Sequence, residues 1–176
     1  MLTLHRAEIE TPVGPMVAIA SDEALSVLEF GNRERFTRLA ARLARWFPPH
    51  EIDDNGSAVI ERVREWLGRY FSGTDADASG LPLDMRGAPF EQRVWAALRE
   101  IPAGATTSYG EMARRLGDPG ASRAVGAANG ANPIAIIVPC HRVIGADGSL
   151  TGYGGGLGRK TWLLDHERRW RRDSLF

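Results

Sequence analysis

The hydrophobic pattern of the first third of the chain changes from strand-like to helical. Apolar and polar residues alternate loosely over residues 4–9, 16–20 and 25–30, with turn-forming residues between these segments. This pattern predicts a small antiparallel sheet. Residues 34–47 and the segment that follows Ser57 then carry apolar residues at helical spacing. They predict two amphipathic helices, the second capped by Ser57.

A stretch rich in small and turn-forming residues, 72–88, comes next, and we predict that it is a linker. Pro89 suits the first turn of a following helix, which ends near Ile101. Two short helical segments, 108–116 and 121–129, are joined by a glycine-containing turn. They predict a helix-turn-helix.

The C-terminal part is less regular. We predict a buried strand or extended core segment over residues 134–138, a glycine-rich loop over 145–158 and a last helix that starts near Arg159. The fold class is therefore α+β. A small N-terminal domain with an antiparallel sheet and helices, 1–86, precedes a mainly helical domain, 87–176.

Charge is unevenly distributed, although the chain carries 22 basic and 22 acidic residues in total. Residues 1–86 contain 10 arginines and 14 acidic residues, whereas residues 87–176 contain 12 basic and 8 acidic residues. This asymmetry favours two domains and places any polyanionic partner on the second. Part of the excess lies in a basic tail that is also typical of a solvated helix end, formed by Arg168, Arg169, Arg171 and Arg172.

The composition is that of a globular protein, with 43% hydrophobic and 25% charged residues. No apolar run is long enough to span a bilayer, and the first residues do not have the pattern of a signal peptide. We therefore expect a cytoplasmic protein without a membrane partner. The single cysteine excludes an internal disulfide and a multi-cysteine zinc site, and the four histidines lack metal-ligand spacing. We expect no metal and no cofactor.

That single cysteine, Cys140, lies in the most informative segment of the chain, between Pro139 and His141-Arg142. A thiol attacks only as the thiolate, and a nearby imidazole or guanidinium lowers its pKa. Cys140 is thus a candidate nucleophile. Two alternatives remain open on these residues alone: the cysteine packs as a small hydrophobe, and Arg142 is solvated.

The segment 139–143, Pro-Cys-His-Arg-Val, resembles the active-site signature of the O6-alkylguanine-DNA alkyltransferases. Other blocks resemble that family in the same order, namely residues 107–113, 122–130, 132–133, 152–153 and 163–167. The resemblance is close over residues 88–168, and the pattern is similar to the bacterial constitutive type. It implies a ribonuclease H-like supporting domain at 1–86 and a winged-helix-like DNA-binding and alkyl-acceptor domain at 87–176.

The resemblance implies a role for each residue that matches the family's motifs. Cys140 accepts the alkyl group, His141 deprotonates it through a water, and Glu167 orients His141. Tyr109 donates to guanine N3, and Asn132 braces the active-site segment. The protein is consumed after one transfer, from O6-alkylguanine and also from O4-alkylthymine.

The same resemblance implies that the partner is double-stranded DNA that contains O6-alkylguanine. It also implies a monomer, and it leaves open whether several monomers bind DNA cooperatively. The damaged base is flipped out of the duplex, and Arg123 fills the gap. The small residues of the second short helix enter the minor groove. The DNA-binding residues are then Tyr109, Ser122, Arg123, Ala124, Gly126 and Ala127. Tight packing between helices is the alternative explanation for those small residues.

The substrate pocket implied by the resemblance contains Val143, Tyr153, Gly154 and Gly155, and the backbone carbonyls of Cys140 and Val143 accept from the guanine amine. Gly154 departs from family members that carry serine or alanine there. Glycine keeps the backbone N–H and adds room, so we expect tolerance of alkyl groups larger than methyl.

Three rival functions are compatible with parts of the sequence. A DNA-binding module without transfer would lack the cysteine, and a cysteine hydrolase would turn over repeatedly and use an oxyanion hole. A transcription factor would carry larger polar residues on its recognition helix than this chain does. The order of the family-like blocks favours the alkyltransferase.

Overall fold

A computed structural model describes the backbone of residues 1–173 and the side chains of residues 1–170. The chain divides into two compact units, Met1–Arg86 and Gly87–Phe176. Arg171 and Arg172 of the basic tail lie outside the described side chains. No helix in the described part of the chain is long and apolar enough to cross a membrane.

Unit 1 is built on a four-stranded sheet with the order β3-β2-β1-β4. Strands β1 (Leu2–Ile9), β2 (Met16–Ala20) and β3 (Leu25–Phe30) pair antiparallel, as predicted. Strand β4 (His50–Asp53) was not predicted, and it pairs parallel to β1. The predicted antiparallel pairing of three strands is confirmed, and β4 adds a parallel edge strand to it. With the sequence His-Glu-Ile-Asp, β4 is too short and too polar to show a strand pattern.

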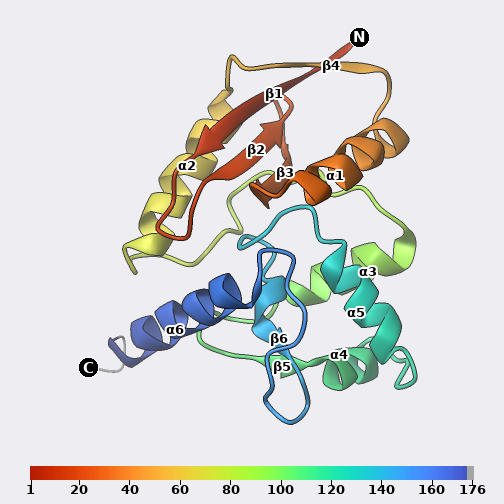
Figure 1. Cartoon of the computed structure of the whole chain (residues 1–176), viewed down its shortest axis with the longest axis vertical. Helices are drawn as coiled ribbons and strands as arrows, with labels where there is room; N and C mark the ends of the chain where they lie inside the picture. Colours follow the sequence, from red (N-terminus) through yellow and green to blue (C-terminus); the bar gives the residue numbers. More distant parts are fainter. Residues whose placement is uncertain (174–176) are drawn as a thin grey trace. The chain divides into compact units, whose positions relative to one another are not determined.

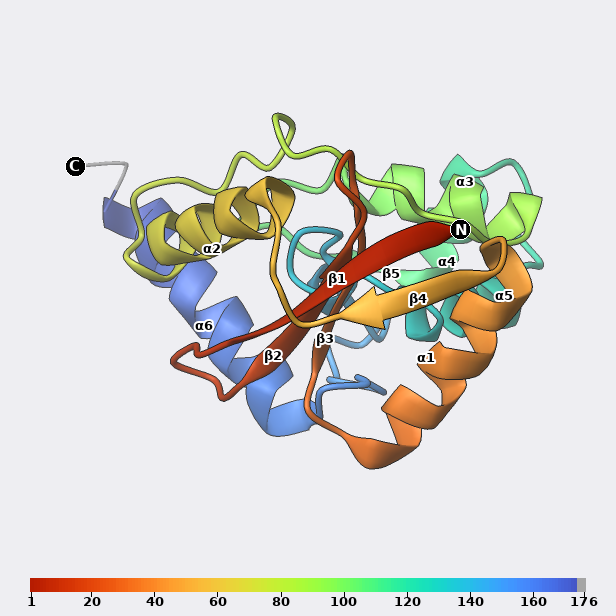
Figure 2. The same cartoon turned by 90° about the horizontal axis from the view of Figure 1, so that it is seen from above.

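Helices α1 (Arg33–Trp46) and α2 (Ala58–Phe71) flank this sheet (Figures 1 and 2). Their starts are fixed by side-chain caps, because Asn32 accepts from the Arg35 N–H and Ser57 accepts from the Ile60 N–H. Leu39 and Leu43 of α1 pack on Leu4, Ile19 and Val27 of the sheet. The two predicted helices are confirmed.

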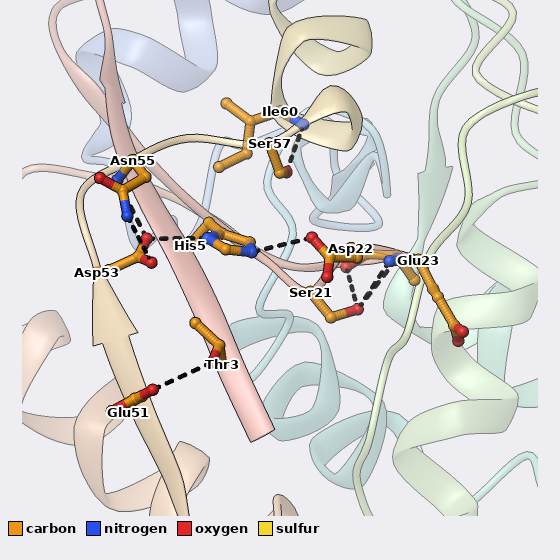
Figure 3. A network of polar contacts seen from close by, with 11 residues as sticks. Thr3, His5, Ser21, Asp22, Glu23, Glu51, Asp53, Asn55, Ser57 and Ile60 are labelled. Carbon is orange, nitrogen blue, oxygen red and sulfur yellow. Dashed lines mark hydrogen bonds and ion pairs between the residues drawn. The ribbon is translucent and has the colours of Figure 1, made fainter. Parts of the chain in front are cut away.

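His5 ties β1 to its neighbours at the β4 edge of the sheet (Figure 3). Its Nδ1 lies 2.8 Å from Asp53 Oδ1 and its Nε2 lies 3.0 Å from Asp22 Oδ1. The hydrogen bond with Asp53 raises the pKa of His5, against the opposing effect of burial. A protonated His5 therefore bridges two carboxylates on different segments.

The segment predicted as a linker is packed onto unit 1. The Leu25 N–H donates to the Pro82 carbonyl and the Asp84 N–H donates to the Leu25 carbonyl, each at 2.8 Å. The guanidinium of Arg86 lies 4.2 Å from the ring centre of Phe47. Turn-forming composition described the irregular backbone correctly, but it could not show that this backbone pairs with a strand edge.

Unit 2 is mainly helical and carries one short two-stranded sheet (Figure 1). Its helices are α3 (Pro89–Leu98), α4 (Tyr109–Arg115), α5 (Ser122–Gly130) and α6 (Leu157–Asp173). Strands β5 (Thr107–Ser108) and β6 (Val143–Ile144) pair parallel. The two short helices of the predicted helix-turn-helix are present as α4 and α5, and they pack on one another.

Residues 134–138 form a buried turn, so the predicted strand or extended segment is wrong. Ile136 has a φ of +69°, in the left-handed region that side chains rarely adopt. Asn132 holds this turn, since its Oδ1 accepts from the Ile134 N–H at 3.0 Å and its Nδ2 donates to the Val138 carbonyl at 2.8 Å. An apolar run five residues long does not distinguish a buried turn from a buried strand.

Candidate active site

Cys140 is the first residue of a single 3₁₀ turn, Cys140–Arg142, that directly follows the buried turn. Its side chain is buried, with 7% of the residue exposed. The Cys140 N–H donates to the Val138 carbonyl at 2.8 Å. The thiol is therefore carried on a backbone that hydrogen bonds fix on its N-terminal side, which suits a group that must hold its direction of attack.

Glu167 of α6 joins His141 and Arg142 in a buried cluster. The Glu167 Oε1 lies 2.7 Å from His141 Nε2. Arg142 donates from Nε to Oε2 and from Nη2 to Oε1, both at 2.9 Å, and from Nη1 to the Ile101 carbonyl at 2.6 Å. Arg142 is therefore a buried ion-pair partner, and the alternative that it is solvated is wrong.

The protonation states of this cluster follow from its burial and its charges. Burial alone would raise the pKa of Glu167, but hydrogen bonds and charge from His141 and Arg142 outweigh it and hold that pKa well below its usual range. Burial lowers the pKa of His141 more than Glu167 raises it. At neutral pH the cluster thus contains an ionised Glu167, a charged Arg142 and a neutral His141.

One ring nitrogen of neutral His141 is hydrogen-bonded to Glu167, and the other can accept a proton. Since ionised Glu167 can only accept, His141 Nε2 carries the proton and donates it to Glu167. His141 Nδ1 then carries a lone pair, and it is buried without a hydrogen-bond partner among the described residues. This tautomer is the one that a general base requires.

Lys160 is a buried residue of this region that the sequence analysis missed. It has no exposed surface, and its Nζ donates to the Val143 carbonyl at 2.6 Å and to the Thr151 carbonyl at 2.9 Å. Desolvation lowers the pKa of Lys160, whereas the negative charge of a Cys140 thiolate raises it. Lys160 is the only lysine among 22 basic residues, which is a signal that the sequence did offer.

Two asparagines hold the backbone around Cys140. Asn132 braces the turn that precedes it, as described above. Asn129 of α5, which the sequence analysis did not single out, donates from Nδ2 to the Cys140 carbonyl at 3.2 Å. Both side chains are buried. The segment that carries Cys140 is thus held by two side-chain amides, one from α5 and one from the residues that follow it.

Tyr109, the first residue of α4, is tied to the glycine-rich loop. Its hydroxyl lies 3.4 Å from the Thr151 carbonyl, to which Lys160 also donates. A Cβ placed on Gly126 would lie 3.9 Å from the Tyr109 ring, so the ring borders α5 at that glycine. The structure therefore brings Tyr109, Lys160 and the loop into one network.

Helix α5 has one buried and one exposed face. Val125, Ala128 and Asn129 are buried. Arg123, Ala124 and Ala127 are exposed, while Ser122 and Gly126 are half-buried. Small residues thus serve packing on one side of the helix and leave a low, exposed surface with a single arginine on the other. Arg123 is not brought into the Cys140 cluster.

The predicted pocket residues follow Cys140 on β6 and the glycine-rich loop. Val143 is buried, and Tyr153, Gly154 and Gly155 are half-buried. The Gly155 carbonyl accepts from Arg159 Nη1 at 3.1 Å, which holds the end of this loop against the start of α6. Val143 is linked to Cys140 directly, because its N–H donates to the Cys140 carbonyl.

Unit 1 carries a groove of about 850 Å³ whose lining does not include the single cysteine. Its lining mixes charges and apolar side chains, among them Arg6, Glu8, Phe36 and Asp54. In the part of the chain that the structure describes, no cluster of three or more histidine, cysteine or acidic side chains is arranged to hold a metal ion. The residues suited to covalent chemistry lie in unit 2.

Two family models match the chain, one over each unit. Residues 4–85 match the model described as 6-O-methylguanine DNA methyltransferase, ribonuclease-like domain. Residues 89–169 match the model described as 6-O-methylguanine DNA methyltransferase, DNA binding domain. Together they cover nearly the whole chain.

Individual relatives agree along their full length. The methylated-DNA–protein-cysteine methyltransferase of Salmonella typhimurium is 45% identical over 169 residues, which cover 95% of this chain and 97% of the relative. That of Mycobacterium leprae is 46% identical over 165 residues, covering 94% and 93%. The solved structure of Mycobacterium tuberculosis OGT in complex with DNA superposes with a TM-score of 0.79 at 42% identity, covering 96% of this chain and 94% of that one.

Proposed function

Because the chain belongs to the 6-O-methylguanine DNA methyltransferase family, we propose that Cys140 is the residue that takes the alkyl group from O6-alkylguanine in DNA. The family's activity is repair of methylated DNA by transfer to a protein cysteine. Cys140 is the only cysteine of the chain, and it is followed directly by a histidine that is hydrogen-bonded to Glu167. This single observation carries the proposal, since the relatives are named for transfer to a cysteine and this chain has one cysteine.

The geometry supports a specific route for the proton and the alkyl group. His141 Nδ1 takes the Cys140 proton through a water, while Glu167 accepts from Nε2 and stabilises the imidazolium that forms. The thiolate attacks the alkyl carbon, the C–S bond forms, and the C–O6 bond breaks with its electron pair going to the base. The proton held by His141 is returned through solvent to the guanine product. Buried Lys160 stabilises the thiolate.

The product of this step explains a single use of each molecule. Water does not displace the thiolate from a thioether under mild conditions, whereas it does hydrolyse the ester or thioester intermediate of a hydrolase. His141 has no second reaction to assist, and Cys140 remains alkylated. The protein is therefore consumed in proportion to the lesions that it repairs.

Base flipping is part of the proposed route, because the alkyl group on O6 of a stacked base cannot reach a buried thiol. The exposed face of α5 offers small residues for close approach to a minor groove, and Arg123 offers a side chain to fill the gap in the stack. In this account Ser122, Ala124, Gly126 and Ala127 contact the DNA. Tyr109 donates to N3 as charge develops on the leaving guanine.

The remaining roles follow the same assignment. Val143, Tyr153, Gly154 and Gly155 form the pocket, and Asn132 braces the segment that carries Cys140. Unit 2 binds DNA and accepts the alkyl group, while unit 1 supports it. We further propose a cytoplasmic monomer that also acts on O4-alkylthymine.

A titration of protein against lesions tests this function. A duplex with one O6-methylguanine is mixed in increasing excess with the wild-type chain, and the repaired lesions are counted. We expect a plateau at one lesion per chain, no repair by Cys140→Ala with DNA binding retained, and weaker binding and slower repair by Arg123→Ala. Repair that continues beyond one lesion per chain, or repair by Cys140→Ala, would contradict the proposal.

A further inference from the structure

Asn55 and Gly56 form an exposed asparagine–glycine pair in unit 1 that the mechanism above does not use. The pair lies in the short connection between β4 and α2, directly before Ser57, the N-cap of α2. Asn55 is exposed, and Gly56 has a φ of +72°. A Cβ placed on Gly56 would meet no atom within 4 Å, so the space around this backbone is open.

The amide of Asn55 is bound to the carboxylate of Asp53 (Figure 3). Its Nδ2 donates to Asp53 Oδ2 at 2.8 Å, and the Asn55 backbone N–H donates to Asp53 Oδ1 at 3.1 Å. The N–H of the next residue, Gly56, donates to no carbonyl or side chain in the described part of the chain. A backbone nitrogen without a protein acceptor therefore follows an exposed primary amide.

An asparagine followed by glycine can react with its own main chain. The nitrogen of Gly56, once it has lost its proton, attacks Cγ of Asn55; a C–N bond closes a succinimide ring, and ammonia leaves. Water then opens the ring at either carbonyl and gives aspartate or isoaspartate. Glycine favours the attack because it has no Cβ to crowd it and adopts backbone conformations that other residues avoid.

The chain contains a second asparagine–glycine pair in a setting that opposes this reaction. Asn129 and Gly130 lie in α5, where backbone N–H groups belong to the helical hydrogen-bond ladder. Asn129 is buried, and its Nδ2 donates to the Cys140 carbonyl at 3.2 Å. Ring closure here requires the end of the helix to open, whereas at Asn55 it requires only rotation within an exposed connection.

The other two asparagines of the chain lack a suitable neighbour. Asn32 precedes Arg33, whose side chain crowds the attack. Asn132 precedes Pro133, which has no N–H proton to lose. Asn55 is therefore the asparagine at which sequence and surroundings both favour ring closure.

We propose that Asn55 is a spontaneous modification site, at which attack by the Gly56 nitrogen deamidates the folded protein to aspartate and isoaspartate. The product replaces the amide that donates to Asp53 by a carboxylate, so unit 1 gains one negative charge beside the Asp53–His5 hydrogen bond. Isoaspartate also lengthens the main chain by a methylene shortly before the cap of α2. The inference does not depend on the proposed function, because the state of Cys140 does not enter it.

Peptide mapping of aged protein tests this inference. The folded wild type is incubated in mildly basic buffer, and mass spectrometry follows the gain of about 1 Da that accompanies replacement of NH₂ by OH. Electron-transfer fragmentation distinguishes isoaspartate from aspartate. We expect the rate at Asn55 to exceed the rate at Asn129 by about tenfold or more, because the helix must open before Asn129 reacts. In denaturant, where both pairs are unfolded, the two rates should become similar.

Gly56→Ala is the variant that tests the attacking atom, since it keeps Asn55 and adds a methyl group beside the Gly56 nitrogen. We expect the gain at Asn55 to slow several-fold. Gly73→Ala is the matched control, because Gly73 also has a positive φ, of +76°, with no atom within 4 Å of an added Cβ. It shares the backbone strain of the first variant and should leave the rate at Asn55 unchanged.

Three results would overturn the inference. The first is an Asn55 that stays unmodified in the folded protein, and the second is an equal rate at Asn55 and Asn129 in that state. The third is a rate at Asn55 that Gly56→Ala does not lower, because the Gly56 nitrogen would then not be the attacking atom. Thermal melting shows whether each variant folds, and the folded and denatured rates of the wild type decide the inference without either variant.

Discussion

Glu167 is the residue on which the buried charges of unit 2 depend. Its two oxygens accept from His141 and from both sides of the Arg142 fork. Glu167→Gln keeps the shape but leaves Arg142 as an uncompensated buried charge, which costs about 3–5 kcal/mol of unfolding free energy. We expect a large fall in the denaturation midpoint and loss of alkyl transfer at temperatures where the variant is still folded.

Glu111→Gln is the matched comparison for that variant. Glu111 forms an ion pair with Arg114 at 2.6 Å, but both side chains are exposed, Glu111 by 50% and Arg114 by 61%. Exposed pairs of this kind contribute less than about 1 kcal/mol. If the two variants shifted the denaturation midpoint equally, the buried cluster would not have the role assigned to it.

Gly154 sets the room beside the alkyl group in the proposed pocket. Serine at this position keeps the backbone N–H and fills space, so Gly154→Ser should slow transfer from O6-benzylguanine more than transfer from O6-methylguanine. Rates on both substrates for wild type and variant measure this. A ratio that does not change would show that Gly154 has no part in alkyl size selection.

At the residue scale, the sequence predicted the candidate nucleophile, Cys140, and only part of its surroundings. Because Cys140 and His141 are adjacent, local pattern was sufficient for them. Glu167, Lys160 and Asn129 come from other helices, and the resemblance implied a role for Glu167 alone. Asn129 lies in a family-like block and Lys160 is the only lysine, but their contacts with the Cys140 segment appear only in the structure.

At the scale of one element, helix α5 packs against unit 2 with one face and exposes the other. Its exposed small residues are proposed to approach the DNA backbone, so Ala127→Glu places bulk and negative charge on that surface. We expect binding to an unmodified duplex to weaken by about tenfold or more, with an unchanged melting temperature. Binding isotherms at two salt concentrations measure this.

Ala96→Glu on α3 is the control for that substitution, because Ala96 is also an exposed alanine in a helix of unit 2. It adds the same side chain to a surface without an assigned role in binding. Equal losses of affinity in both variants would indicate a general charge effect and remove α5 from the proposed interface.

The β4 edge of the sheet makes the stability of unit 1 depend on pH. His5 has a raised pKa and Asp53 a lowered one, each through the hydrogen bond between them. The ion pair is complete when the pH lies above the folded pKa of Asp53 and below the usual pKa of histidine, near 6.5. It is lost as the pH rises through the raised pKa of His5. We expect the stability contributed by His5 to be greatest in weak acid and to be modest in size.

Melting temperatures at pH 5.5 and pH 8.5 check this dependence. The wild type should lose more stability between the two than His5→Asn does. His50→Asn is the control, because His50 contacts the Pro48 carbonyl and pairs with no carboxylate among the described side chains. A pH dependence that is the same in His5→Asn and wild type would contradict the assignment.

The sequence predicted elements where a period was long enough to be recognised. The first three strands and both amphipathic helices of unit 1 follow their patterns. Strand β4 is polar and only four residues long, and its pairing with β1 depends on a contact across half of the unit. The segment 134–138 is apolar enough to be predicted as a strand, but it forms a turn. Hydrogen bonds from the Asn132 side chain to the backbone hold this turn, and no hydrophobic period in the sequence indicates them.

At the scale of the whole molecule, the charge asymmetry and the two family matches divide the chain at nearly the same place. The acidic unit holds a sheet and a groove, and the basic unit holds the only thiol and the histidine proposed as its base. A chain without net charge can thus contain a basic unit, since net charge sums over both units.

Intact-protein mass spectrometry after exposure to O6-methylguanine DNA tests the central claim most directly. We predict one gain of about 14 Da per chain, the mass of one CH₂, located by peptide mapping on Cys140, with no further gain when DNA is in excess. Repair of the DNA with an unmodified Cys140, or with the methyl group on another residue, would contradict the account.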